Sequence, residues 1–227
     1  MPERALIEKR PWLVASLIAA ISYFFVQGSA VPGLFLIIWK SAGVALLAVY
    51  ALVRHRGTDS RQIAAVMACG ALGDALIEIS LEAGAAAFLI GHLIAIALYL
   101  RHRRVAKTPS QHALAFTMLV AIPLIAWSLP ADRSLAWAVA GYSVALAGMA
   151  ATAWTSSFSR YTVGLGAVMF AASDLLIFAR MGLLATSVLP GLMIWPLYYF
   201  GQFLICTGVI GELRQRGSAT NLQPRAL

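Results

Sequence analysis

The sequence has 227 residues, of which 61% are hydrophobic and only 11% are charged. This apolar fraction is well above that of soluble domains, so it excludes an ordinary soluble protein and indicates a polytopic membrane protein. The formal net charge is +8, but the basic residues fall in short runs between apolar segments. That pattern is typical of cytoplasmic loops and argues against nucleic acid as a partner.

Apolar runs long enough to cross a membrane recur along the whole chain. A hydrocarbon core of about 30 Å takes about 20 helical residues. We predict eight such helices, in chain order 11–27, 32–53, 61–80, 83–100, 112–129, 134–154, 160–180 and 190–212. The connections are short, so we expect an all-α helical bundle in one transmembrane domain, 11–212. The ends, 1–10 and 213–227, are predicted to be loose tails in water.

Arginine and lysine are concentrated in alternate connections. The basic connections carry Arg54, Arg56 and Arg61, then Arg101, Arg103, Arg104 and Lys107, and then Arg160. The intervening connections have no basic residue apart from Arg133 and Arg180. By the positive-inside rule, the basic connections and both termini are predicted to be cytoplasmic, which agrees with an even number of spans.

Ionisable and polar residues interrupt five of the apolar runs at a similar depth. They are Lys40, Asp74, Glu78, His92, Asp174, Tyr198, Tyr199 and Gln202. From a rise of about 1.5 Å per residue, most of them lie roughly 9–15 Å beneath the outer surface, with Gln202 one turn deeper. An isolated charge costs about 3 kcal/mol or more at this depth, so we expect these side chains to face one another. The sequence therefore predicts a polar pocket in the outer half of the membrane.

Two short segments resemble each other at a distance of four spans. "GDALI" at 73–77 resembles "SDLLI" at 173–177, and "GHLI" at 91–94 resembles "GQFL" at 201–204. Four is an even number, so a repeat of this kind would be parallel. It would place Asp74 and Asp174 in related positions that face a common centre.

Five motifs, in this order along the chain, resemble the YhhN family, whose animal members are lysoplasmalogenases. They are "IIWKSAG", "GALGDALIEI", "FLIGHLIAIALY", "GAVMFAASDLLIFA" and "YYFGQFLI", and the resemblance runs roughly from Trp39 to Gly211. One departure is Ser41, where the family often has proline after the lysine. That change affects the local bend and leaves the charge of Lys40 in place.

The resemblance implies hydrolysis of the vinyl ether bond of a lysoplasmalogen, which gives a fatty aldehyde and a glycerophospho-alcohol. The partners would be a lysophospholipid substrate and membrane lipid, with no cofactor. We expect a multi-pass protein of a bacterial inner membrane. The head group, the oligomeric state and whether the natural substrate is a plasmalogen stay open.

Vinyl ether hydrolysis starts with protonation on carbon and passes through an oxocarbenium ion that water captures. The reaction needs a proton donor and a negative group that stabilises the cation and orients water. A carboxylic acid and a carboxylate supply these, as in glycoside hydrolysis. Burial favours the neutral acid, whereas an adjacent ammonium favours the carboxylate. We therefore expect Asp74 and Asp174 to be the catalytic pair, with Lys40 keeping one of them ionised. Which aspartate is the acid stays open; the apolar neighbours of Asp174 slightly favour it.

The other polar residues are expected to support this pair. Tyr198, Tyr199, Gln202 and His92 would position water or the glycerol hydroxyls, and Glu78 would line an entrance. Adjacent residues lie about 100° apart on a helix. The two neighbouring tyrosines are therefore not both expected to face the pocket.

Other interpretations of the same residues remain. Asp74 and Lys40 would form a structural ion pair if no chemistry took place there, and His92 an ordinary hydrogen bond between helices. A zinc site of Asp74, Asp174 and His92 is a poor candidate because only one buried histidine is available, so we expect no metal. The main alternative is a small transporter or proton-coupled carrier, although the spans lack a Pro/Gly-interrupted pair at corresponding positions.

Overall fold

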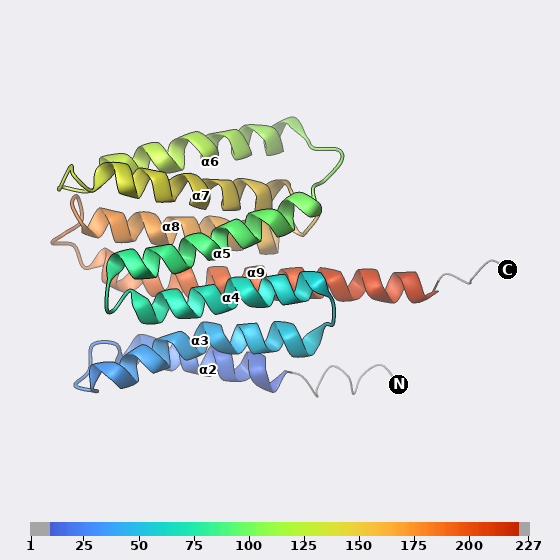
Figure 1. Cartoon of the computed structure of the whole chain (residues 1–227), viewed down its shortest axis with the longest axis horizontal. Coiled ribbons are helices and arrows are strands. Elements are labelled where there is room, and N and C mark those ends of the chain that lie inside the picture. Colours follow the sequence, from blue (N-terminus) through green and yellow to red (C-terminus); the bar gives the residue numbers. More distant parts are fainter. Residues whose placement is uncertain (1–9, 223–227) are drawn as a thin grey trace.

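The structure is a computed structural model, and it describes residues 10–222. That part of the chain is all-helical (Figure 1). Its helices are α2 (Pro11–Val26), α3 (Gly33–Arg54), α4 (Thr58–Leu76), α5 (Leu81–Arg101), α6 (Pro109–Ser128), α7 (Ala136–Thr155), the π-helical turn η1 (Arg160–Gly164), α8 (Leu165–Arg180) and α9 (Leu189–Leu222). They overlap the predicted spans in order, so the all-α fold is confirmed. Most of the predicted N-terminal tail and the last residues of the C-terminal tail lie outside the described residues.

Six of the described helices are long and apolar enough to cross a membrane. They are α3, α5, α6, α7, α8 together with η1, and α9. The chain is therefore an integral multi-pass membrane protein. α2 is apolar but only 16 residues long, and α4 is less apolar because it carries Asp59, Arg61 and Asp74. The count of eight crossings stays a prediction.

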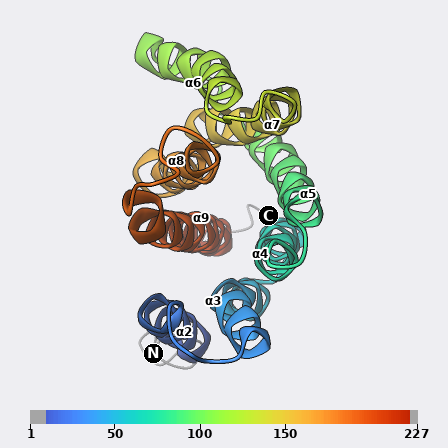
Figure 2. The same cartoon turned by 90° about the vertical axis from the view of Figure 1, so that its left-hand side faces the viewer.

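Consecutive helices pack side by side, with one exception. α2 contacts α3, α3 contacts α4 and α4 contacts α5, and the same order holds from α6 to α9. α5, however, contacts α7 and leaves α6 at the edge of the bundle, as the end-on view shows (Figure 2). α9 lies against both α3 and α4 as well as α8. This places α4, α8 and α9 around a shared interior.

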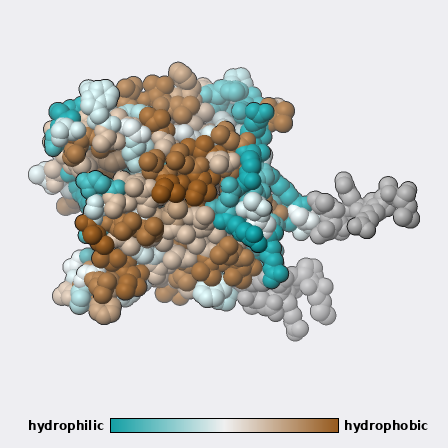
Figure 3. Space-filling view, in the orientation of Figure 1, coloured by the Kyte–Doolittle hydropathy of each residue, from teal (hydrophilic) through white to brown (hydrophobic). Residues whose placement is uncertain are grey.

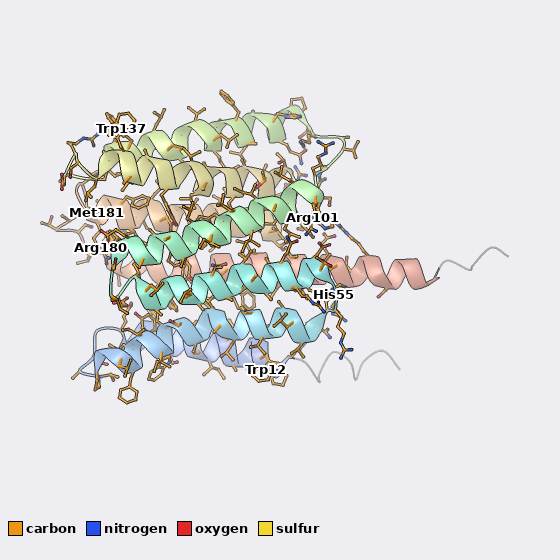
Figure 4. All side chains as sticks on the ribbon, viewed as in Figure 1. Trp12, His55, Arg101, Trp137, Arg180 and Met181 are labelled. Carbon is orange, nitrogen blue, oxygen red and sulfur yellow. The ribbon has the colours of Figure 1, made fainter. Side chains whose placement is uncertain are left out.

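The two ends of the bundle differ in charge. His55 and Arg101 lie at one end, whereas Arg180 and Met181 lie at the other (Figure 4). On the face shown in Figure 3, a broad apolar area separates hydrophilic residues, which gather most strongly at the His55 end. Large apolar side chains such as Phe25 are exposed on the outer surface, as expected for helices that face lipid.

Two predicted helix ends lie farthest from those in the structure. α4 ends at Leu76, and 77–79 form a turn, so Glu78 lies in the connection to α5 and not in the helix. α9 continues beyond residue 212 to Leu222. The apolar pattern ends near residue 212. A helix that continues into water needs no apolar residues, so the end of the apolar run did not predict the end of the helix.

α5 packs closely on α4 at Gly91. A Cβ atom at Gly91 would lie 3.2 Å from the Cβ of Cys69 and 3.7 Å from the carbonyl oxygen of Val66. The missing side chain therefore lets the two helices approach each other.

α9 packs on α8 in the same way at Gly201. A Cβ atom there would lie 2.8 Å from the carbonyl oxygen of Gly166 and 3.5 Å from the Cβ of Met169. Gly166 and Met169 precede Asp174 by eight and five residues. On α4, Val66 and Cys69 precede Asp74 by the same numbers of residues. The two helix pairs thus pack in the same register, as a parallel repeat requires.

A methyl group at Gly201 should force α8 and α9 apart. Gly201→Ala would place carbon 2.8 Å from the oxygen of Gly166 and 3.1 Å from the nitrogen of Phe170. We expect a loss of about 1–3 kcal/mol in unfolding free energy, measured by thermal unfolding in detergent. Gly141→Ala is the control, because nothing lies within 4 Å of its Cβ position. Equal stability of the two variants would contradict the close packing.

Candidate active site

A cavity inside the bundle brings the two intramembrane aspartates together. Asp74 from α4 and Asp174 from α8 both line it, together with Lys40 from α3 and Tyr198 from α9. The apolar part of its wall is formed by Ile77, Leu81, Ala85, Phe88, Ile177, Phe178, Ile194 and Trp195. The empty space is about 560 Å³, part of it open to the surroundings. We call it the aspartate cavity.

Tyr198 holds Asp74 from the opposite side of the cavity. Asp74 is only 3% exposed, and the Tyr198 hydroxyl donates to its Oδ2 at 2.8 Å. The Tyr198 ring makes edge contacts with Phe88 and Phe170, with centroids 5.7 and 5.3 Å away. Gly73 makes room for this group, since a Cβ there would lie 2.7 Å from the Phe88 ring. Packing therefore sets the direction from which Asp74 receives its hydrogen bond.

Asp174 is held by a different tyrosine. It is 5% exposed, and the Tyr142 hydroxyl of α7 donates to its Oδ2 at 2.7 Å. The Tyr142 oxygen is also 3.0 Å from Nε2 of His92 on α5. Because a hydroxyl has one proton to donate, His92 donates to Tyr142 through Nε2 in this arrangement. The result is a chain of hydrogen bonds from His92 through Tyr142 to Asp174.

The direct partner of Lys40 is Glu78 and not an aspartate. Its Nζ lies 2.6 Å from Oε1 of Glu78. This corrects the expectation of a close pairing between Lys40 and one aspartate. The physical reason is the early end of α4, since the turn after Leu76 carries Glu78 toward α3. Lys40 nevertheless lines the aspartate cavity beside Asp74.

A second, polar space continues outward from the aspartate cavity. The two share five lining residues, Lys40, Ile77, Ile177, Ile194 and Trp195. The outer space, about 760 Å³ in empty volume, adds Gln27, Glu78 and Arg180. Arg180 lies at the end of the bundle opposite Arg101 (Figure 4). A polar mouth thus leads to a chamber with apolar walls, and Glu78 lies at this mouth.

Four of the predicted supporting residues do not line the aspartate cavity, namely Glu78, His92, Tyr199 and Gln202. The Tyr199 hydroxyl is 2.7 Å from Oγ of Ser16 on α2, and its ring stacks on Trp195 with centroids 6.0 Å apart. Tyr199 therefore joins helices and does not face the aspartates. Gln202 lies deeper, where it lines a separate cavity with His92. Only one of the neighbouring tyrosines faces the aspartates, in agreement with the helical geometry.

Two polar residues of the site, Tyr142 and Ser173, were not predicted from the sequence. α7 carries no charged residue, so nothing marked it as part of the polar layer. The available signal was a single tyrosine in the small-residue run "AVAGYSVALAG". Ser173 lines the aspartate cavity, with its Oγ 3.5 Å from Oδ1 of Asp174.

The residues of the zinc alternative are not assembled as a ligand set. Among residues 10–222, no three His, Cys, Asp or Glu side chains are grouped so that they could hold a metal ion. His92 instead reaches Asp174 through the Tyr142 hydroxyl.

Comparison with known proteins covers every residue that lines the aspartate cavity. The YhhN family model matches residues 35–209. The chain belongs to the YhhN family. Two relatives of this YhhN chain, from Mycobacterium bovis and Mycobacterium tuberculosis, are both named lysoplasmalogenase. Each is 31% identical over 179 residues, covering 75% of this chain and 68% of the relative. No solved structure matches the chain.

Removing the Tyr142 hydroxyl should destabilise the YhhN chain. Tyr142→Phe takes a hydrogen-bond partner from both Asp174 and His92, and each buried polar group left unpaired costs about 1–3 kcal/mol. We expect a lower unfolding midpoint in detergent. Tyr161→Phe is the matched control, because Tyr161 is 75% exposed. If both variants unfold like the wild type, the hydrogen-bond chain does not contribute to stability.

Proposed function

We propose that this protein is an intramembrane hydrolase that cleaves the vinyl ether bond of lysoplasmalogens. The observation that carries the proposal is the pair of buried carboxyl groups, Asp74 and Asp174, which line one largely apolar cavity. The relatives named lysoplasmalogenase support the substrate class. A single-chain lipid suits this arrangement, with its head group at the polar mouth and its sn-1 linkage beside the aspartates.

The surroundings favour different roles for the two aspartates. Lys40 comes from α3, which packs on the helix of Asp74, and it lines the cavity beside that residue. A nearby ammonium favours an ionised carboxylate, whereas an apolar wall favours the neutral acid. Asp174 therefore acts as the general acid, and Asp74 starts the reaction ionised.

Two carboxyl groups suffice for a complete catalytic cycle. Asp174 gives its proton to the vinyl carbon distal to the ether oxygen, and an oxocarbenium ion forms. Water attacks this ion while Asp74 takes a proton from the water, which yields a hemiacetal. Asp74 then protonates the glycerol oxygen as the carbon–oxygen bond breaks, and Asp174 removes the hemiacetal proton. Aldehyde and glycerophospho-alcohol leave, and both carboxyl groups return to their starting states.

The two tyrosines orient the carboxyl groups for this cycle. Tyr142 and Tyr198 each donate to Oδ2 of their aspartate. Oδ1 of Asp74 then faces the substrate, as does Oδ1 of Asp174, which also lies 3.5 Å from the Ser173 hydroxyl. His92 supports Tyr142 through the hydrogen bond to its hydroxyl. Tyr199 has a structural role between α2 and α9.

We place this site in the outer half of a bacterial inner membrane that residues 11–212 cross eight times. The tails 1–10 and 213–227 then lie in the cytoplasm. The arginine-rich connections at the His55 and Arg101 end support this orientation.

Aldehyde release from a 1-alkenyl lysophospholipid by detergent-purified protein tests the hydrolase. Asp74→Asn and Asp174→Asn should each lower kcat by about 100-fold or more, because each removes a group that transfers protons. Asp132→Asn, at an exposed loop position, should leave kcat unchanged. Folding of all variants is checked by size-exclusion chromatography.

Full turnover by both aspartate variants would overturn the carboxyl mechanism. Failure of the folded wild type to release aldehyde from any lysolipid would overturn the hydrolase itself. A carrier would then be the better interpretation, with activity only in sealed vesicles.

Reporter fusions test the orientation. A fluorescent protein that matures only in the cytoplasm, fused after the C-terminus, should fluoresce because an even number of spans returns the chain to the starting side. Alkaline phosphatase fused after Ser187, in the connection between α8 and α9, should be active because that connection faces outward. The opposite pattern would reverse the leaflet from which the substrate enters.

A further inference from the structure

A second buried cavity lies deeper than the aspartates. Its wall includes Tyr99 of α5 and Gln202 of α9, together with His92. Tyr99 and Gln202 are 1% and 2% exposed, and each has a buried oxygen without a hydrogen-bond partner, the Tyr99 hydroxyl and the Gln202 Oε1. Tyr99 precedes Arg101 by two residues in α5, and Arg101 lies at the end of the bundle away from the polar mouth (Figure 4). We call this space the deep cavity.

Two residues that line one cavity and each carry an unpaired oxygen indicate a polar ligand. A buried polar group without a hydrogen-bond partner lowers the stability of the folded state. Buried water makes about two to four hydrogen bonds to otherwise unsatisfied groups, and it binds in small cavities that offer such partners. Gln202 and Tyr99 offer such partners, in a space too small for a lipid group.

We propose that the deep cavity binds water and supplies the molecule that the hydrolysis consumes. This inference rests on the proposed function for the role of the water, although the binding of water does not.

An aromatic partition separates the deep cavity from the lipid chamber. Phe88 lines both spaces. Its ring contacts those of Phe170 and Tyr198 at centroid distances of 6.0 and 5.7 Å. A lipid chain on the outer side of these rings is therefore kept from the water on the inner side.

The polar connection through this partition runs past Gly70. A Cβ atom at Gly70 would lie 2.8 Å from Nε2 of Gln202 and 3.2 Å from the Tyr198 hydroxyl. The amide and the hydroxyl thus converge on one point beside α4, and the same hydroxyl is 2.8 Å from Oδ2 of Asp74. Water held by Gln202 lies beside the Tyr198–Asp74 pair, where Asp74 takes its proton as the oxygen bonds to the oxocarbenium carbon.

Water that enters from the deep cavity does not have to pass the bound lipid. The reaction needs one water for each lipid, but a bound lipid fills the mouth and the apolar chamber. A separate water site on the other side of the reacting bond admits the nucleophile without flooding the cavity in which the oxocarbenium ion forms.

The binding of water is tested first, without any substrate. Radiolytic hydroxyl labelling modifies buried side chains only where bound water lies next to them. We expect labelling of Tyr99 in the wild type and its loss in Gln202→Leu, whereas Phe158, which is 0% exposed and does not line the cavity, stays unlabelled. A Tyr99 that is as unreactive as Phe158 in the wild type would overturn the water site.

The role of the water is tested with a competing nucleophile. Aldehyde and the mixed acetal formed by 2-propanol are measured together, since this alcohol is too large for the deep cavity and captures the same oxocarbenium ion. In Gln202→Leu we expect aldehyde formation to fall about tenfold, as for one lost hydrogen bond, and the acetal-to-aldehyde ratio to rise. Gly70→Ala should change the ratio in the same direction, which guards against a folding defect in the first variant.

Gln62→Leu is the matched control. Its Oε1 is also buried without a partner, but Gln62 does not line the deep cavity, so rate and ratio should stay at wild-type values. An unchanged ratio in both Gln202→Leu and Gly70→Ala would overturn the role of the deep cavity and assign water entry to the mouth. Absence of aldehyde from the wild type would instead refute the hydrolase, and the labelling result would still decide whether the cavity holds water.

Discussion

Two carboxyl groups buried among apolar helices impose the main constraint on this fold. A carboxyl group in such a place needs a hydrogen-bond donor, and a helix cannot supply one from its own satisfied backbone. Each aspartate therefore requires a donor from another helix, Tyr198 for Asp74 and Tyr142 for Asp174. These bonds tie α4 to α9 and α8 to α7, so the order of helices around the cavity and the chemistry of the cavity have the same cause.

The two halves of the bundle share a packing register but differ in how each aspartate is hydrogen-bonded. Gly91 and Gly201 bring α5 and α9 onto equivalent positions of α4 and α8. Three residues before these glycines stand Phe88 and Tyr198. Phe88 corresponds to Tyr198 but has no hydroxyl to donate. Asp174 therefore receives its hydrogen bond from Tyr142 of α7. A symmetric frame thus holds two aspartates in unequal surroundings, which is what an acid and a base working together require.

Polarity changes twice along the interior. The mouth carries Glu78 and Arg180, the aspartate cavity is mostly apolar, and the deep cavity again presents unpaired oxygens. A lysolipid matches the first two layers, with its head group at the mouth and its ether linkage and chain in the aspartate cavity, and water matches the third. The proposed activity thus has a structural basis in the order of these layers as well as in the two aspartates.

The helices and the presence of a polar layer could be predicted from the residues alone. Apolar runs of sufficient length predict spans because the hydrocarbon core leaves the backbone no other partners, and rare intramembrane charges such as Lys40, Asp74 and Asp174 stand out against that background. The motifs around these charges were also enough to indicate the YhhN family.

Which of these groups meet depends on the packing of the helices. Depth along a helix follows from counting residues, but rotation about its axis and the choice of neighbours are properties of the folded bundle. For that reason Lys40 pairs with Glu78, Tyr199 turns toward Ser16, and Tyr142 enters the site from a helix without charges. The unpaired oxygens of Tyr99 and Gln202 are likewise invisible in a sequence, because an unmet hydrogen bond is defined by the folded surroundings.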